Sequence, residues 1–290
     1  MLERKMINLG FVGPSRPAND YKLTDVVDGD TPKIEMSVRM VSIDTPETHF
    51  GGTPATAQAA LERTKARLQD GTYDAIPEHL REYLISRITP NAADRHMTAG
   101  QLAAEAHKAM VKTRLTRPDG TQRKLAVVAT GELVENHGRL LAYTAPWFAG
   151  GPSDPLPPRD DLRRRTFNLD LLSLGWAASF LIYPSVPPSF DLNLMLDEAE
   201  VAWEQKRGAW AQFGPELLLG YEYRACVKLG AKDLKDPAEA VANAYERVCV
   251  DLRNLTEVGL YGYHQVPPPH RLWIWQKDLE QARKDLPIKH

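Results

Sequence analysis

The spacing of hydrophobic and polar residues changes along the chain and divides it into four regions. In the first region, branched apolar residues predict strands over about 21–27 and 38–43, with turn residues at 28–32 between them. From about 49 to 95 the apolar positions fall at helical spacing instead. This second region therefore predicts a helical insertion that follows a β-hairpin.

The third region, about 96–212, mixes both kinds of spacing. It predicts a helix capped by Thr98, strands over about 124–130 and 139–144, and helices over about 162–178 and 192–213. The last region has helical spacing throughout, and three helices are predicted near 216–230, 237–255 and 271–285. We expect an α+β fold in which residues 1–212 carry the insertion at about 49–95, followed by an all-α C-terminal extension over 213–290.

Composition and charge narrow the possible functions. Apolar residues make up 43% of the 290 residues, which is enough to fill a core. The formal net charge of -2 gives no general attraction for nucleic acid, so any phosphate-binding surface must be local. The densest basic run is Arg163-Arg164-Arg165, and we interpret it as a solvated helix start.

The two cysteines, Cys226 and Cys249, are far apart and outside any CxxC motif. They exclude a disulfide framework and a cysteine-rich zinc site, and we expect buried free thiols, although one bridge between them is possible. The first residues lack the apolar stretch of a signal peptide, and no run of about 18 apolar residues predicts a membrane span. We therefore expect a soluble, cytoplasmic protein.

The candidate chemistry begins with the four carboxylates Asp28, Asp30, Asp44 and Glu47. Asp28 and Asp30 share one side of an extended chain, and a hairpin could bring all four groups together. Unpaired carboxylates at such proximity repel one another, so a cation is expected among them. Oxygen ligands in that number favour calcium or magnesium over zinc.

Two arginines accompany these carboxylates. Arg39 lies on the same side of its predicted strand as Val41 and Ile43, where a charge is costly unless an anionic group meets it. An ion pair with an aspartate, or a packed stem with an exposed head, explains Arg39 equally well. Arg139 begins a strand directly after Gly138, which by itself is more typical of a surface residue.

Taken together, these motifs resemble the staphylococcal thermonuclease family. The chain contains DGDT at 28–31, an arginine five residues before an aspartate, DTPE at 44–47, and HGRLLAY at 137–143. The familiar form in that family is DGDT…R-x4-DTPE…YGR-x-LAY. The resemblance covers about residues 20–50 and 96–212, and later stretches are similar to the two helices that follow the family's barrel.

The resemblance implies a five-stranded OB-type β-barrel with packed helices. It implies the following roles: Asp30 and Asp44 as side-chain ligands of a calcium ion, Thr45 as a ligand through its carbonyl, Asp28 as a support of the metal, Glu47 as the group that activates water, Arg39 and Arg139 as the phosphate clamp, and His137 and Tyr183 beside the nucleotide. Magnesium or manganese could replace calcium, which is scarce in cytoplasm. His137 stands where the family has tyrosine, and Leu181 replaces a tyrosine that lines the pocket.

The function implied by the resemblance is metal-dependent hydrolysis of phosphodiester bonds in DNA, RNA or both, leaving 3′-phosphate ends. Two alternatives stay open. OB barrels commonly bind nucleic acid or protein without cutting, so the chain could be a binding module. It could also be a nuclease subunit that is active only in a complex with a protein partner or as a homo-oligomer, formed through residues 213–290.

Overall fold

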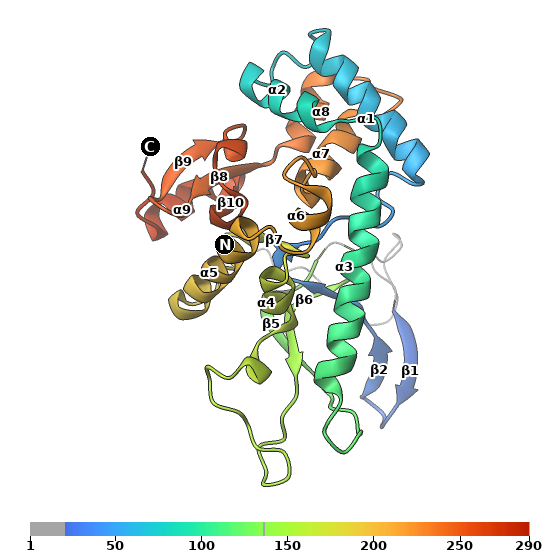
Figure 1. Ribbon diagram of the computed structural model, residues 1–290, viewed down its shortest axis with the longest axis vertical. Helices are drawn as coiled ribbons and strands as arrows, with labels where there is room; N and C mark the ends of the chain where they lie inside the picture. The colour runs from blue at the N-terminus through green and yellow to red at the C-terminus, as the bar shows by residue number, and fades with distance from the viewer. Residues whose placement is uncertain (1–20, 136, 290) are drawn as a thin grey trace.

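The computed structural model describes residues 21–135 and 137–289, which form an α+β fold with three β-sheets (Figure 1). The first sheet is an antiparallel hairpin of β1 (Lys22–Val26) and β2 (Pro32–Glu35). All residues of both strands are exposed, and the hairpin projects at one edge of the molecule. The predicted strand and turn at this position are confirmed, but β1 pairs with β2 and not with the predicted strand over 38–43, so the expected hairpin of those two strands is wrong. The strands of the described residues form no closed barrel, and the OB-type barrel stays a prediction.

The second sheet has the strand order β3-β6-β5. Strand β3 (Val38–Met40) runs parallel to β6 (Leu140–Pro146), which pairs antiparallel with β5 (Leu125–Val134). The single strand predicted over 38–43 is interrupted, because Ser42 adopts a φ of 63°. The chain continues as β4 (Ser42–Asp44), which joins a different sheet.

The third sheet has the order β4-β7-β10-β8-β9 and corrects the expectation of an all-α extension. Its strands beyond β4 are β7 (Ala178–Ile182), β8 (Arg247–Asp251), β9 (Thr256–Gly259) and β10 (Arg271–Trp275). The predicted helices over 237–255 and 271–285 are therefore wrong in part. The apolar runs at 248–250 and 272–274 are too short for periodicity to separate a buried strand from a helix. Both runs are strands because β10 pairs with β7, Leu272 opposite Leu181, and with β8, Leu272 opposite Val250.

The helical content predicted for the second region is confirmed by α1 (Pro54–Gln69) and α2 (Glu78–Arg87). Helix α3 begins before Thr98, at Ala92, and runs to Leu115 along much of the molecule's length (Figure 1). The remaining helices are α4 (Phe167–Ser173), α5 (Ser189–Glu204), α6 (Ala209–Phe213), α7 (Gly220–Leu229), α8 (Pro237–Ala244) and α9 (Leu279–Asp285), with short 3₁₀ turns at 162–164, 263–265, 268–270 and 276–278. Across 21–135 and 137–289, no helix combines the length and apolarity needed to cross a bilayer.

The insertion and the C-terminal region share one hydrophobic core. Helices α1, α2, α7 and α8 gather at one end of the molecule (Figure 1). Buried side chains from both segments meet there, among them Leu61, Leu84, Tyr223, Cys226 and Trp273. Cys226 and Cys249 are both free and buried, as the sequence predicted. This shared core fixes α7 beside β4, and that placement determines the surroundings of the candidate site.

Candidate active site

Arg39 lies on β3, and Arg139 directly precedes the neighbouring strand β6. In the parallel pairing of β3 with β6, Arg39 is opposite Leu141, and Arg139 comes two residues before Leu141. Because side chains alternate between the faces of a sheet, Arg39 and Arg139 project from the same face. The structure thus brings together the two arginines that the sequence assigned to one phosphate.

Asp44 lies at the end of β4, with only 3% of its side chain exposed. Arg39 donates a hydrogen bond to Asp44 Oδ1 at 3.1 Å, which fits the ion-pair interpretation of Arg39. A further guanidinium, from Arg224 of α7, donates to Oδ1 at 3.1 Å and to Oδ2 at 2.9 Å. Burial raises the pKa of Asp44, but Arg224 and Arg39 outweigh it and hold the pKa below its usual value.

Glu47 joins the same cluster through Arg224. The Nη1 atom of Arg224 donates to Glu47 Oε1 as well as to Asp44. Burial lowers the pKa of Arg224, and the two carboxylates raise it by a larger amount, so the guanidinium stays charged. The Glu47 side chain is 27% exposed, so it remains accessible to water.

Arg139 is held by Glu135. Its Nε donates to Glu135 Oε1 at 2.6 Å, and its Nη2 donates to Oε2 at 3.2 Å. Hydrogen bonding to Arg139 lowers the pKa of Glu135, and Arg39 contributes in the same direction. The charge of Glu47 in turn raises the pKa of Arg139, and the charge of Arg224 lowers it. These interactions make the arginines and carboxylates one electrostatic unit, which we call the charge cluster: Arg39, Asp44, Glu47, Glu135, Arg139 and Arg224.

His96 of α3 fixes the backbone at Glu47. The Glu47 N–H donates to His96 Nε2 at 2.9 Å, so the opposite nitrogen, Nδ1, carries the proton and donates to Leu218 O at 2.9 Å. The imidazole is fully buried and stacks on Tyr223 with ring centroids 3.8 Å apart. Burial lowers the pKa of His96 to about 3, so the ring is neutral at physiological pH.

Two glycines allow helices to approach this turn closely. A Cβ at Gly100 of α3 would lie 2.6 Å from Glu47 O. A Cβ at Gly220 of α7 would lie 2.8 Å from Thr45 O and 2.9 Å from Asp44 Cγ. The first turn of α7 therefore packs directly against the carbonyl of Thr45 and the carboxylate of Asp44, both of which the sequence assigned to calcium.

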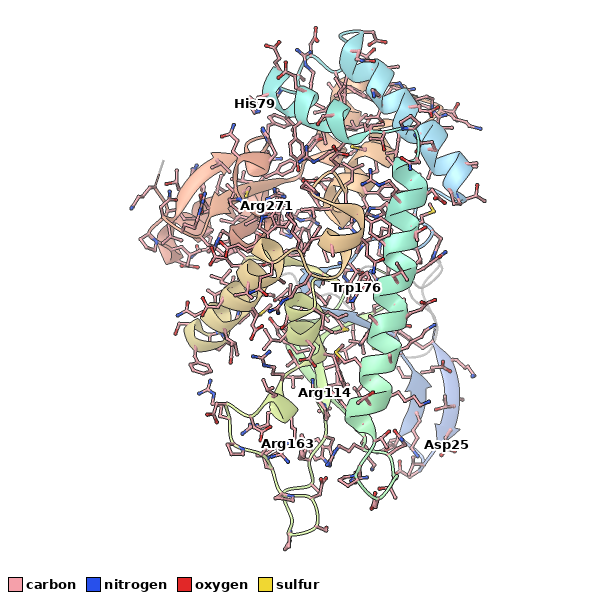
Figure 2. The ribbon with its side chains drawn as sticks, viewed as in Figure 1. Asp25, His79, Arg114, Arg163, Trp176 and Arg271 are labelled. Atoms are coloured by element: carbon pink, nitrogen blue, oxygen red, sulfur yellow. The ribbon has the colours of Figure 1, made fainter. Side chains whose placement is uncertain are left out.

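The other predicted metal residues lie elsewhere. Asp28 and Asp30 are exposed in the turn of the β1–β2 hairpin, and Asp30 Oδ1 accepts a hydrogen bond from Thr31 Oγ1 at 3.1 Å. In Figure 2 the neighbouring Asp25 marks this hairpin at the outer edge of the molecule, well separated from Arg271 of β10. Within the described ranges, no three His, Cys, Asp or Glu side chains are placed to hold a metal ion. The predicted calcium ligands are therefore not assembled in this arrangement.

The predicted substrate residues are also separated. His137 is exposed beside Glu135, and its charge lowers the pKa of Glu135. Tyr183 follows β7 and donates a hydrogen bond to Asp285 of α9. Asp44 of β4 pairs with Ala178, the first residue of β7. Tyr183 comes five residues after Ala178 along the chain, which is about 17 Å at the rise of a strand. The structure thus places His137 near the charge cluster and Tyr183 with the C-terminal helix.

Sequence reasoning missed Arg224, Glu135 and His96. Arg224 belongs to a region that matches no motif, and its signal is a charge among the apolar residues of α7. His96 had no signal beyond its position on a helix. The contacts of both residues depend on the packing of α3 and α7 around the turn at Glu47, which periodicity does not predict.

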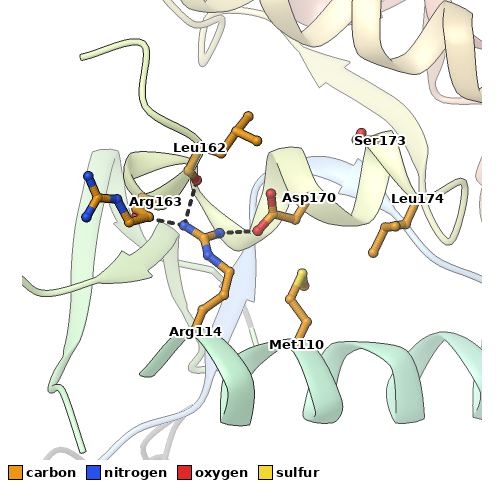
Figure 3. Close-up of a pocket in the computed structure, with 7 residues that line it drawn as sticks. All are labelled: Met110, Arg114, Leu162, Arg163, Asp170, Ser173 and Leu174. Carbon is orange, nitrogen blue, oxygen red and sulfur yellow. Dashed lines mark hydrogen bonds and ion pairs between the residues drawn. The ribbon is translucent and has the colours of Figure 1, made fainter. Parts of the chain in front are cut away.

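A pocket of about 330 Å³ lies away from the charge cluster, between the end of α3, the turn at 162–164 and α4. Figure 3 shows Arg114 inside it, directed at Asp170 and at the backbone around Leu162 and Arg163. Arg114 pairs with Asp170 and donates to Leu162 O at 3.2 Å, Arg163 O at 2.9 Å and Arg165 O at 2.8 Å. These contacts hold the turn at 162–165 against α3 and α4. Arg163 itself is 70% exposed and pairs with Asp161, which fits a solvated helix start.

Comparison with known proteins adds no assignment, because neither a family model nor a curated protein matches the chain. The thermonuclease resemblance therefore rests on the sequence motifs alone.

Proposed function

We propose that this chain hydrolyses phosphodiester bonds in nucleic acid at the charge cluster. Arg39 and Arg139 would hold the phosphate, and Glu47 would accept a proton from the attacking water. The support for this proposal is spatial. Residues from three separate segments, which the sequence assigned to one site, lie in one electrostatic unit with partly exposed side chains.

The chemistry suits these residue types. Attack on a phosphodiester adds negative charge to the phosphorus centre, and two guanidinium groups can donate paired hydrogen bonds to its oxygens. A carboxylate within reach of water can act as a general base. The Arg39 and Arg139 side chains are 31% and 39% exposed, so a phosphate can reach them without unfolding the strands.

The resemblance also implies an OB-type barrel, which belongs to this proposal, and a calcium ion. The ion would supply neutralisation of the phosphate charge. As placed, however, Asp44 is enclosed by Arg39 and Arg224, and Asp30 lies in an exposed turn, so the described residues do not fit that ion. The steps proposed for Arg39, Arg139 and Glu47 therefore do not involve a metal.

Digestion of single-stranded DNA and RNA tests the proposal. Arg39→Ala, Arg139→Ala and Glu47→Gln should each lower the cleavage rate roughly 100-fold or more, because each removes a group that stabilises or promotes the transition state. Arg163→Ala, whose side chain is 70% exposed in a separate turn, is the matched control and should cleave like the unmodified chain. Undiminished cleavage by the three site variants would remove the assignment.

A second candidate function is binding without cleavage. The observation that favours it is the engagement of both Asp44 and Glu47 by Arg224, which leaves neither carboxylate free of an ion pair. In that case, oligonucleotides bind but are not cut in calcium, magnesium or manganese. Arg139→Ala should then weaken binding and reduce its salt dependence by about one phosphate contact.

A further inference from the structure

We propose that Arg224 occupies the place of a divalent cation at Asp44 and Glu47, so that metal and Arg224 compete for the same carboxylate oxygens. The inference rests on the proposed function only for the identity of these carboxylates as the site. It concerns a residue from the C-terminal region, which the thermonuclease resemblance does not cover.

The contacts of Arg224 resemble those of a bridging cation. Its guanidinium reaches both oxygens of Asp44, at 3.1 and 2.9 Å, and one oxygen of Glu47. Asp44 Oδ1 also accepts from Arg39, so every oxygen of this buried carboxylate already has a donor. A calcium ion needs several oxygens within about 2.3–2.6 Å, and it could gain them here only by displacing Arg224.

The charges of the cluster support the same conclusion. Arg39 and Arg224 balance Asp44 and Glu47 within one set of ion pairs, and Arg139 balances Glu135 in a separate pair nearby. A divalent ion added to this set would face an adjacent guanidinium with no carboxylate left to neutralise it. Like charges at such short range repel strongly where the dielectric is low.

Arg224 is held in position by its helix. Thr64 of α1 donates a hydrogen bond to Cys226 O at 2.6 Å, and Tyr223 donates to Phe50 O at 3.1 Å. At the start of α7, the fully buried Glu222 pairs with Arg271 at 3.3 Å. These contacts fix α7 in the shared core. The folded helix therefore holds the Arg224 guanidinium against Asp44 and Glu47.

Metal titration of the full chain tests the inference without any measurement of cleavage. Calcium and manganese binding are followed by calorimetry for the unmodified chain, Arg224→Met and Arg253→Met. Arg253 is the matched control, because it donates to Asp251, a carboxylate with 7% of its side chain exposed, elsewhere in the C-terminal region. We expect no saturable binding below about 1 mM in the unmodified chain and in Arg253→Met. Arg224→Met should bind one ion at least roughly tenfold more tightly.

The double variant Asp44→Asn/Arg224→Met should lose the gained binding. If Arg224→Met does not fold, the unmodified chain still decides the question. An ion that binds the folded state raises the melting temperature, so an unchanged melting temperature in millimolar calcium supports the proposal. A rise that Asp44→Asn abolishes would overturn it, as would Arg224→Met binding no more tightly than the unmodified chain. Metal affinity and melting temperature are measured without cleavage. A failure of this proposal is therefore distinguishable from a failure of the proposed nuclease function.

Discussion

At the residue scale, the burial of Asp44 determines which groups must surround it. A carboxylate that is 3% exposed pays a large desolvation cost unless it is paired and hydrogen-bonded, and Arg39 and Arg224 meet that requirement. Its lowered pKa means that its contribution to stability is present above the ordinary value of 3.8 and is lost as the pH falls below it. Removing Arg224 would take the donor from Asp44 Oδ2, and breaking a buried ion pair in this way typically costs about 3–5 kcal/mol, whereas Asp44 keeps both contacts to Arg224 when Arg39 is removed.

His96 gives the stability of the fold a second pH dependence, separate from that of Asp44. Its pKa is lowered from 6.5 to about 3 by burial, so the unfolded chain binds a proton that the folded chain excludes between those values. Stability from the neutral ring is therefore complete above pH 6.5 and falls as the pH drops towards 3, with a slope approaching about 1.4 kcal/mol per pH unit.

The substitution His96→Gln should remove this slope, because an amide keeps polar atoms near Glu47 and Leu218 but does not titrate. Urea unfolding of both proteins between pH 5 and pH 7 measures the difference, and all other histidines are common to the two. Equal slopes in the two proteins would show that His96 is not held neutral by the fold.

At the element scale, the local pattern predicted those elements whose partners are close in sequence. Strand β1, its turn and the helices α1 and α2 follow from turn residues and apolar spacing within a few positions, whereas β2, which pairs with β1, was not predicted. Strands β8 and β10 were missed because their apolar runs are short and β10 pairs with the distant β7. For the candidate site, the motifs indicated Arg39, Asp44, Glu47 and Arg139. They could not indicate Arg224, which reaches the cluster only because α7 packs beside β4.

The close approach of α7 to β4 gives a prediction for this element. Gly220→Ala should destabilise the chain by about 1–3 kcal/mol, because the added methyl would lie 2.8 Å from Thr45 O and must displace the helix. Helix propensity alone would predict the opposite sign, a gain of about 1 kcal/mol. Denaturant unfolding measures the change. Gly151→Ala is the control, since nothing lies within 4 Å of the position where its Cβ would be. A stabilised Gly220→Ala protein would show that α7 does not press on Asp44.

At the scale of the whole molecule, helix α3 and the C-terminal region enclose the turn at 44–47 from two directions. Helix α3 contacts it through Gly100 and His96, and α7 contacts it through Gly220 and Arg224. Strand β10 joins β7, which pairs with β4, so the sheet that carries Asp44 continues into the C-terminal region. The geometry of the charge cluster thus depends on segments that lie outside the motifs.

This integration predicts that a chain ending at residue 212 does not fold independently. Truncation removes Tyr223, Cys226 and Trp273 from the core and leaves their partners Leu61 and Leu84 in water. Each large buried side chain contributes about 1.5–3 kcal/mol, so the loss of several is comparable with the roughly 5–15 kcal/mol by which a native protein is stable. Circular dichroism with denaturant titration should show no cooperative transition for the truncated chain. Arg224→Met in the full chain serves as the comparison, because it removes the guanidinium but keeps the core. A cooperative transition in the truncated chain would mean that residues 1–212 form a unit by themselves, and that the C-terminal region regulates the site without being needed to build it.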